Sequence, residues 1–291
     1  APLDRYPSFR IGGPARRIAF PRSGEAAVLL VSHALELGAR PFVLGNGTNV
    51  LFLDEGVERL VICTRDMAGV AAGAVAGEIT AECGASLAKI AVFAQKAGLS
   101  GLEFAHGIPG SLGGAVCMNA GAYGGEMSDV IKEVTFLDEN LDFQTAKATD
   151  LSYSYRHSYF MDHPGCVIVE AVMELWAQAS CEIEAEMADF TKRRKEKQPL
   201  EYPSAGSTFK RPPGYYTGPL IRQAGLAGLV MGGAQVSKKH TGFVINREEA
   251  TARDVLRLIK TIQYKVRSQY GVLLEPEVRI FGEDTDEKRG S

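Results

Sequence analysis

The sequence has no long hydrophobic run and no excess charge of one sign. Across its 291 residues, no uninterrupted apolar stretch approaches the roughly 20 residues that are needed to span a bilayer. The first residues, APLDRYPSFRIGG, also lack the apolar core of a secretory signal peptide. A net charge of -3 gives no general electrostatic attraction to nucleic acid or to an anionic membrane. We therefore expect a cytoplasmic protein that has neither partner and that holds any anionic ligand at a local site.

Cysteine is scarce and its spacing is uninformative. The five cysteines are well separated and form neither a CxxC pair nor a cluster with histidine. Because their number is odd and no such grouping occurs, disulfide scaffolds and zinc sites are both disfavoured. We expect reduced, mostly buried cysteines and no metal site.

Hydrophobic periodicity predicts alternating helices and strands. Helices are expected at 24–37, 87–98, 181–198 and 251–271, with Ser86 and Thr251 as N-caps. Strands are expected at 40–44, 56–64, 130–138, 167–176, 242–246 and 273–282, and residues 74–86 alternate weakly, as an edge strand does. The tail 283–291 is expected to be disordered.

Glycine is concentrated in residues 107–125, GIPGSLGGAVCMNAGAYGG, where it supplies seven of nineteen positions. Such a segment is either a set of tight turns crossing under a core or a wall against which another molecule lies. Ser111, Asn119 and Tyr123 add polar groups to this apolar wall, which is typical of a cofactor pocket. The sequence alone leaves both readings open.

A second glycine loop, GNGTN at 45–49, follows the strand expected at 40–44. Its backbone N–H groups could bind a phosphate, with Thr48 and Asn49 adding side-chain donors, although such turns are also common without a ligand. Neither loop matches a P-loop or the GxGxxG dinucleotide fingerprint. A polar and an apolar glycine loop together suit a ligand that has a diphosphate and a large flat ring.

Several polar residues elsewhere have both a functional and an ordinary interpretation. Arg156 ends a strand-like alternation, SYSYRHS, and could clamp a carboxylate or form a surface salt bridge. Ser207 follows Gly206 and is either a presented hydroxyl or a plain turn serine. LEPEVR is expected to place Glu275, Glu277 and Arg279 on one face of a strand, for chemistry or for an ion pair. His240, beside Lys238 and Lys239, could contact an anion or belong to a solvated basic turn, and KRRKEK at 192–197 is typical of a solvated helix end.

Seven motifs occur together and in order from about residue 9 to residue 282: FRIGGPA, GNGTNVLF, GIPGSLGGAVCMNAGAYGGE, YSYR, PSAGSTFKRP, GGAQVSKKHTGFVIN and LEPEVR. As a set they resemble the UDP-N-acetylenolpyruvoylglucosamine reductases, also called UDP-N-acetylmuramate dehydrogenases, which are FAD enzymes of bacterial peptidoglycan synthesis. The segment from Arg156 to Ser207 is too short for the tyrosine-bearing loop of the longer branch, so the resemblance is to the shorter, type II branch.

The resemblance implies an α+β protein with the FAD-binding fold of the PCMH, or vanillyl-alcohol-oxidase, flavoproteins. Two α/β subdomains, 1–62 and 63–178, would enclose FAD, and a third, α+β domain, 179–282, would bind the substrate. The FAD contacts would come from the two glycine loops: Gly45, Asn46, Gly47, Thr48, Asn49, Gly107, Ile108, Pro109, Gly110, Ser111, Gly113, Gly114, Asn119, Ala120, Gly121, Ala122, Tyr123 and Gly124. His106 and Cys117 are possible covalent attachment points by position, but FAD is expected to be bound without a covalent link.

The same resemblance implies reduction of UDP-N-acetylglucosamine enolpyruvate to UDP-N-acetylmuramate, with NADPH as reductant. Hydride would pass from flavin N5 to C3 of the substrate, Arg156 would hold the carboxylate, Glu277 would help to polarise it and Ser207 would protonate C2. Substrate contacts would come from Tyr155, Lys195, Arg211, His240 and Arg279, and position 211 departs from the asparagine of the longer branch. We expect a monomer, and the alternatives are a related FAD oxidase or an inert nucleotide-sugar-binding module.

Overall fold

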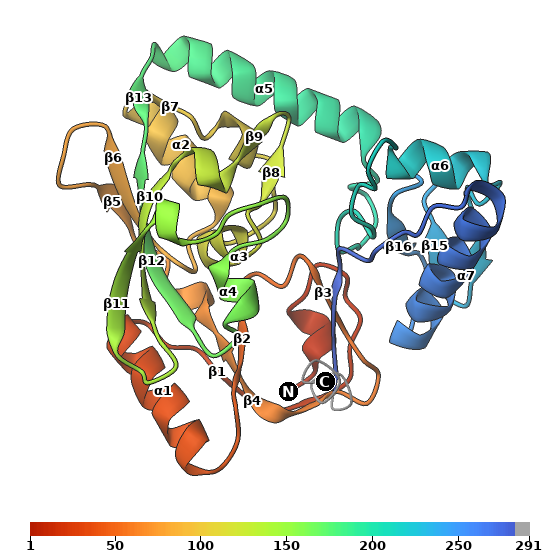
Figure 1. The fold of residues 1–291 in the computed structure, drawn as a ribbon, viewed down its shortest axis with the longest axis horizontal. Helices are drawn as coiled ribbons and strands as arrows, with labels where there is room; N and C mark the ends of the chain where they lie inside the picture. The colour runs from red at the N-terminus through yellow and green to blue at the C-terminus, as the bar shows by residue number, and fades with distance from the viewer. Residues whose placement is uncertain (283–291) are drawn as a thin grey trace. The chain divides into compact units, whose positions relative to one another are not determined.

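The structure is a computed structural model that describes residues 1–282, and the predicted tail 283–291 lies outside them. The chain forms two compact units, which are drawn in Figure 1. Unit 1 consists of residues 1–17, 47–58 and the chain from residue 195, and unit 2 consists of residues 18–46 and 59–194. The N-terminal residues thus belong with the last third of the chain, an association that sequence order does not indicate.

Unit 2 is built on a five-stranded sheet with the order β11-β10-β12-β6-β5. All four pairs are antiparallel. β6 lies between β12 and β5, so the prediction that residues 74–86 form a sheet edge is wrong; β5 is the edge strand. The strands are β5 Val70–Ala72, β6 Glu78–Glu82, β10 Ile131–Leu137, β11 Phe143–Lys147 and β12 Val167–Glu174.

In unit 2, the three helices predicted at 24–37, 87–98 and 181–198 begin and end close to those positions, and two short helices were not predicted. Ser23 and Ser86 cap two of them, since their hydroxyls accept hydrogen bonds from the backbone N–H groups of Ala26 and Lys89. A single apolar core joins these helices to the sheet, with Ile79, Leu87, Ile90 and Leu112 fully buried within it. The helices are α1 Gly24–Glu36, α2 Leu87–Lys96, α3 Leu112–Cys117, α4 Tyr159–Asp162 and α5 Ser180–Lys197, of which α5 lies over α2 in Figure 1.

A second sheet has the order β1-β4-β2, and the GNGTN loop at 45–49 follows its strand β2. β2 (Phe42–Leu44) pairs in parallel with β4 (Val57–Cys63), and β1 spans Ala15–Ala19. The GNGTN loop begins directly at the end of β2, as expected. The chain passes from one unit to the other within β1, within this loop, within β4 and near the end of α5.

The longest helix of unit 1 is α7 (Ala252–Tyr270). Thr251 and Asp254 form a capping box at its start, and the Asp54 carboxylate accepts hydrogen bonds from the first two N–H groups of the helix. Its apolar face packs on the sheet β14-β15-β16 and on the N-terminal residues Phe9 and Ile11. The remaining helix and strands of this unit are α6 Thr217–Gln223, β3 Val50–Phe52, β14 Val230–Met231, β15 Ala234–Val236, β16 Val244–Asn246 and β17 Arg279–Phe281.

The prediction of one strand over 273–282 is wrong for its first half. Only Arg279–Phe281 forms a strand, β17, which pairs in parallel with β3. Glu275 and Glu277 precede it, on either side of an isolated bridge between Pro276 and Phe209, so these acids do not belong to the same strand as Arg279. The short elements that complete the fold are β7 Leu99–Ser100, β8 Gly121–Ala122, β9 Gly125–Glu126, β13 Trp176–Ala177, η1 Leu3–Arg5, η2 Thr64–Asp66, η3 Glu103–Ala105, η4 Met127–Asp129 and η5 Ala148–Asp150.

Among residues 1–282, none of the helices is long and apolar enough to cross a membrane. The five cysteines are all free thiols, and two of them, Cys63 and Cys83, are buried. Burial raises the pKa of the Cys83 thiol to about 12, so this side chain behaves as a small apolar group.

Candidate active site

Arg156 lies in a tight turn of unit 2. Ser154 and His157 exchange two backbone hydrogen bonds of 3.1 Å, and between them Arg156 adopts a left-handed backbone with φ of +57°. The prediction that Arg156 ends a strand-like segment is therefore wrong, because residues 148–150 form the 3-10 helix η5 and residues 151–157 form turns with one isolated bridge between Ser154 and His157. A left-handed arginine is uncommon and is kept only where its surroundings favour it.

The Arg156 guanidinium is bound to the glycine-dense segment. Its Nη1 donates to the Asn119 carbonyl at 3.3 Å and its Nη2 to the Gly121 carbonyl at 2.9 Å. The guanidinium carbon also lies 5.0 Å from the centre of the Tyr155 ring, a cation-π contact on a half-exposed tyrosine. The structure thus brings together two motifs, YSYR and NAGAYG, that the sequence separates by about thirty residues.

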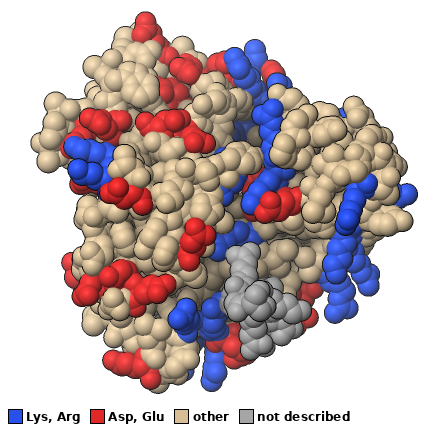
Figure 2. All heavy atoms as spheres, in the orientation of Figure 1, with Lys and Arg blue, Asp and Glu red and all other residues tan. Residues whose placement is uncertain are grey.

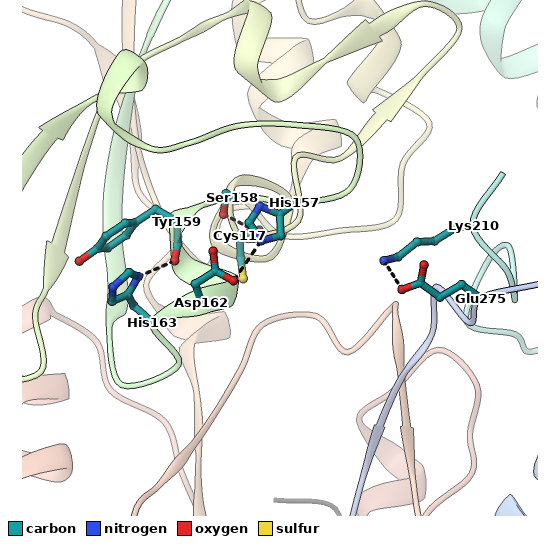
Figure 3. Close-up of polar contacts among 8 residues, drawn as sticks. All are labelled: Cys117, His157, Ser158, Tyr159, Asp162, His163, Lys210 and Glu275. Carbon is teal, nitrogen blue, oxygen red and sulfur yellow. Dashed lines mark hydrogen bonds and ion pairs between the residues drawn. The ribbon is translucent and has the colours of Figure 1, made fainter. Parts of the chain in front are cut away.

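Other polar contacts brace the residues that follow Arg156 (Figure 3). His157 Nε2 lies 3.1 Å from an Asp162 carboxylate oxygen, and the Ser158 hydroxyl donates to the Cys117 carbonyl. His163 is stacked on Tyr159 and bonds its carbonyl through Nδ1. The chain on the C-terminal side of Arg156 is therefore tied to the end of α3.

The glycine-dense segment itself contains α3 and a two-residue hairpin turn. α3 runs from Leu112 to Cys117 and the chain then forms the β8–β9 hairpin, with Tyr123 and Gly124 at its tip, both at positive φ. A Cβ on Gly113 would lie 2.9 Å from Cys83 Cβ, and one on Gly125 would lie 2.7 Å from the Phe104 ring. Packing within the protein therefore explains some of these glycines, which the sequence could not separate from ligand contacts.

The two glycine loops meet at the Ser111 side chain. Its hydroxyl is buried and has no hydrogen-bond partner within residues 1–282. A Cβ on Gly45 would clash with that oxygen, and one on Gly114 would lie 3.7 Å from it, so both glycine loops face this hydroxyl. A buried polar group without a partner costs about 1–3 kcal/mol, which a ligand that has hydrogen-bond acceptors would offset. The Ser111 hydroxyl can donate a hydrogen bond, and Gly45 and Gly114 place no side chain next to it. Both features fit the polar part of FAD.

Helix α5 contributes to this region, which sequence reasoning missed. Phe190 stacks on Tyr123 with 4.6 Å between ring centres, and the Arg194 guanidinium lies 5.9 Å from the Tyr123 ring centre. A Cβ on Gly107 would lie 2.9 Å from Arg194 Nε. Burial lowers the pKa of Arg194, so the reading of 192–197 as a fully solvated helix end is wrong at this residue. The available signal was spacing, since Ile183, Met187, Phe190 and Arg194 fall on one helix face.

Ser207 lies in residues 204–210 of unit 1, a segment that we call the Ser207 strip. This strip bridges to β16 at Ser204 and to Pro276 at Phe209. Thr208 donates its N–H to the Gly242 carbonyl at 2.8 Å, and its hydroxyl accepts from the N–H of Val244 at 2.9 Å. Thr208 and Phe209 are buried, whereas Ser207 is exposed and its hydroxyl makes no hydrogen bond inside the described part of the chain. Gly206 has φ of +75° with open space where a Cβ would be, so the backbone turns there and presents Ser207 outward.

Glu277 is attached to the same strip. Its N–H donates to the Thr208 carbonyl at 2.9 Å, and its carbonyl accepts from the Asn49 side chain at 3.1 Å. Glu275, by contrast, pairs with Lys210 at 2.7 Å (Figure 3). The two acids of LEPEVR therefore differ: Glu275 belongs to a surface ion pair, and Glu277 is half-buried and bonded through its backbone to Thr208, the residue after Ser207.

Four of the predicted substrate contacts lie elsewhere in unit 1. Lys195 is exposed and its carbonyl accepts from Lys239 Nζ at 2.7 Å, which brings it near His240 in the fold. Arg211 lies 4.0 Å from the centre of the exposed Tyr216 ring. His240 accepts from the Gly242 N–H at Nδ1, and burial lowers its pKa, so the ring is neutral near pH 7. Arg279 lies in β17, and its N–H donates to the Asn49 carbonyl at 3.0 Å.

The structure thus groups the predicted residues into two sets. Unit 2 holds Gly45, Asn46, the segment 107–124, Tyr155 and Arg156, and unit 1 holds Gly47, Thr48, Asn49, Ser207, Glu277 and the four substrate contacts just described. No group of three or more histidine, cysteine or acidic side chains able to hold a metal occurs in residues 1–282. On the face shown in Figure 2, acidic and basic side chains are both spread in several small groups rather than forming one field.

Two family models match different parts of the chain. The sequence model of an FAD binding domain matches residues 15–142, and that of the UDP-N-acetylenolpyruvoylglucosamine reductase C-terminal domain matches residues 198–281. A protein named UDP-N-acetylenolpyruvoylglucosamine reductase from Caldanaerobacter subterraneus is 46% identical over 97% of this chain and 92% of its own length. One from Syntrophomonas wolfei is 44% identical over 97% of this chain and 94% of its own length. The crystal structure of the reductase from Thermus caldophilus matches with a TM-score of 0.83 and 35% identity, covering 97% of this chain and 98% of that one.

The fold and the site therefore define an FAD-dependent oxidoreductase, and the predicted fold class is confirmed. The mixed helix and sheet content and the FAD-binding domain are those that the motifs implied. More narrowly, the chain belongs to the UDP-N-acetylenolpyruvoylglucosamine reductase family.

Proposed function

We propose that this chain reduces UDP-N-acetylglucosamine enolpyruvate to UDP-N-acetylmuramate in peptidoglycan precursor synthesis, and that Arg156, Ser207 and Glu277 are its catalytic residues. The observation that carries the reaction is the match to named relatives over 97% of the chain, which includes both the FAD-binding part and the C-terminal part. Bound FAD would supply the hydride-transfer chemistry between NADPH and the enolpyruvyl group, and the two glycine loops would hold it. The protein has to bind the substrate, stabilise the charge that develops and supply a proton.

Adding hydride to C3 of an enol ether leaves negative charge on C2 and on the neighbouring carboxylate. Arg156 is suited to hold that carboxylate, because its guanidinium is already fixed by the Asn119 and Gly121 carbonyls before substrate arrives. A donor that needs no reorganisation stabilises developing charge better than a mobile one. Glu277 would assist by hydrogen bonding to the carboxylate.

Ser207 would then protonate C2. A serine hydroxyl is a weak acid, so it transfers a proton only to a strongly basic carbon such as this one. Its exposure on the strip, with Thr208 fixed beside it, supports this role, since the hydroxyl is presented and not consumed by the protein. The contact from the Glu277 N–H to the Thr208 carbonyl supports a shared location for Ser207 and Glu277.

The remaining assignments follow the same reading. FAD would contact residues 45–49, 107–111, 113–114 and 119–124, with the Ser111 hydroxyl donating to its polar part. Tyr155, Lys195, Arg211, His240 and Arg279 would contact the substrate, with the two exposed cations, Lys195 and Arg211, suited to its diphosphate. We also keep the three-domain division 1–62, 63–178 and 179–282, the monomeric state and the cytoplasmic location as proposals; free thiols at all five cysteines support a reducing compartment.

The test is NADPH oxidation by purified protein with UDP-N-acetylglucosamine enolpyruvate. We expect substrate-dependent oxidation of NADPH and formation of UDP-N-acetylmuramate, and acid denaturation should release free yellow FAD. Colour retained on the denatured chain would refute non-covalent binding. NADPH-independent oxygen consumption with an alcohol would indicate an oxidase, and the lack of flavin absorption bands would indicate an inert binding module.

A further inference from the structure

Asn119 is fully buried, and the protein uses both ends of its side-chain amide. Its Nδ2 donates to the Ser154 carbonyl at 3.1 Å and to the Ser128 hydroxyl at 3.3 Å, and its Oδ1 accepts from the Ser128 N–H at 2.9 Å. Its backbone is left-handed, with φ of +45°. An amide whose nitrogen donates two hydrogen bonds and whose oxygen accepts one within the protein is rigidly oriented.

These contacts meet the Arg156 turn at two points. The Asn119 amide binds the carbonyl of Ser154, the first residue of the turn, and the Asn119 carbonyl accepts from Arg156 Nη1. The Gly121 carbonyl, two residues further, accepts from Arg156 Nη2. One residue thus holds both the backbone that carries Arg156 and the guanidinium at the end of its side chain.

We propose that Asn119 is a positioning residue for Arg156, which orients the guanidinium for the substrate carboxylate. The proposal rests on the function proposed above for Arg156. It gives the Asn119 side chain a different task from the predicted FAD contact, to which its backbone remains able to contribute.

The chemistry of asparagine explains why this position takes that residue. Asparagine tolerates the left-handed region better than most residues, and its amide supplies the N–H that the Ser154 carbonyl requires. Aspartate would fit the backbone and accept from the Ser128 N–H, but it would set a carboxylate oxygen against the Ser154 carbonyl. Glycine would fit the backbone and leave that carbonyl without its donor.

The experiment measures the two half-reactions of the FAD-loaded enzyme separately by stopped flow. Asn119→Gly and Asn119→Asp are expected to slow flavin reoxidation by the enolpyruvyl substrate about 10- to 100-fold, because a displacement of about 1 Å in a catalytic group costs up to about 100-fold. Flavin reduction by NADPH is expected to keep its wild-type rate. Ser128→Ala is the matched control, since it removes one Nδ2 acceptor and leaves the Ser154 contact, and it is expected to react as wild type.

A double-mutant cycle separates positioning from general destabilisation. In an Arg156→Ala background, Asn119→Gly is expected to have little further effect on reoxidation, because the group that it orients is gone. An equal effect in both backgrounds, or equal slowing of the NADPH step, would overturn the proposal.

A second readout does not depend on turnover. In the oxidised enzyme without substrate, the Arg156 side-chain N–H signals in nuclear magnetic resonance spectra are expected to show greater mobility in Asn119→Gly than in wild type or Ser128→Ala. Unchanged mobility would overturn the positioning role. If mobility rises but Arg156→Ala reoxidises normally, the contact holds and the function proposed for Arg156 is what fails.

Discussion

The turn that carries Arg156 and the strip that carries Ser207 hold their functional groups in opposite ways. The Arg156 guanidinium is held by two carbonyls and a tyrosine ring, and its backbone is left-handed. Ser207 is fixed only through its neighbours: Gly206 turns the chain and Thr208 is anchored on both sides, while the hydroxyl is exposed.

This difference suits the roles that we propose for the two groups. A cation that stabilises developing charge acts best when its orientation is set in advance, because reorganisation during the reaction costs free energy. A proton donor has to approach carbon and give up its hydrogen, so hydrogen bonds that hold the hydroxyl elsewhere would oppose it. The structure therefore predicts that side-chain contacts matter for Arg156 and backbone shape matters for Ser207.

The largest effect is expected for Ser207→Ala. Flavin reoxidation by the enolpyruvyl substrate should slow by about 10²- to 10⁴-fold, the usual contribution of a proton donor, whereas NADPH still bleaches the flavin. Stopped-flow absorbance measures both steps. Ser204→Ala, which removes a hydroxyl from the same strip, is the control, and normal reoxidation in Ser207→Ala would remove this serine from the mechanism.

Arg156→Lys tests whether the orientation of the cation matters in addition to its charge. Lysine keeps the positive charge, but its single ammonium cannot bind two carbonyls and a carboxylate in one planar arrangement. We expect reoxidation to slow by about 100-fold, the scale of a misplaced catalytic group. A lysine variant as fast as wild type would mean that charge alone, without orientation, is sufficient.

Gly206→Ala tests the backbone at Ser207 and has a matched control in Gly214→Ala. Both glycines have similar positive φ values, +75° and +77°, and neither has an atom within 4 Å of the added Cβ. Each substitution should lower the free energy of unfolding by about 1–2 kcal/mol through backbone strain, measured by urea denaturation. Only Gly206→Ala should also slow reoxidation, by about tenfold, and equal rates in the two variants would show that the Gly206 turn does not position Ser207.

The smallest effect concerns His240, which is linked to the Ser207 strip through Gly242. Burial lowers the pKa of this ring in the folded state, so the unfolded chain binds the proton first as the pH falls below about 6.5. The free energy of unfolding should therefore decrease as the pH falls from that value through the lower folded pKa. His240→Gln should lose this part of the pH dependence, as thermal denaturation at pH 7.5 and 5.5 can measure; the same dependence in both proteins would contradict the assignment.

Helices were predicted better than strands, for a physical reason. α1, α2 and α7 carry apolar periodicity and capping serine, threonine and aspartate residues, and α5 has an acidic residue in its first turn. The segment 273–278 alternates like a strand, but a strand requires a continuous series of pairs. This segment makes an isolated bridge, Pro276 with Phe209, whereas Arg279–Phe281 pairs along its whole length with β3. β6 likewise looked like an edge because its alternation is weak, although two strands flank it.

The family, the helices and the residue types that the chemistry requires could be predicted from the sequence, because ordered motifs and local periodicity are properties of the chain alone. The folded structure shows which glycines face Ser111 and which face Cys83 or Phe104. It also shows that Glu275 pairs with Lys210 while Glu277 bonds to Thr208, and that Asn119 binds Arg156. Those facts depend on contacts between residues far apart in sequence, and burial and hydrogen-bond geometry exist only after the chain has folded.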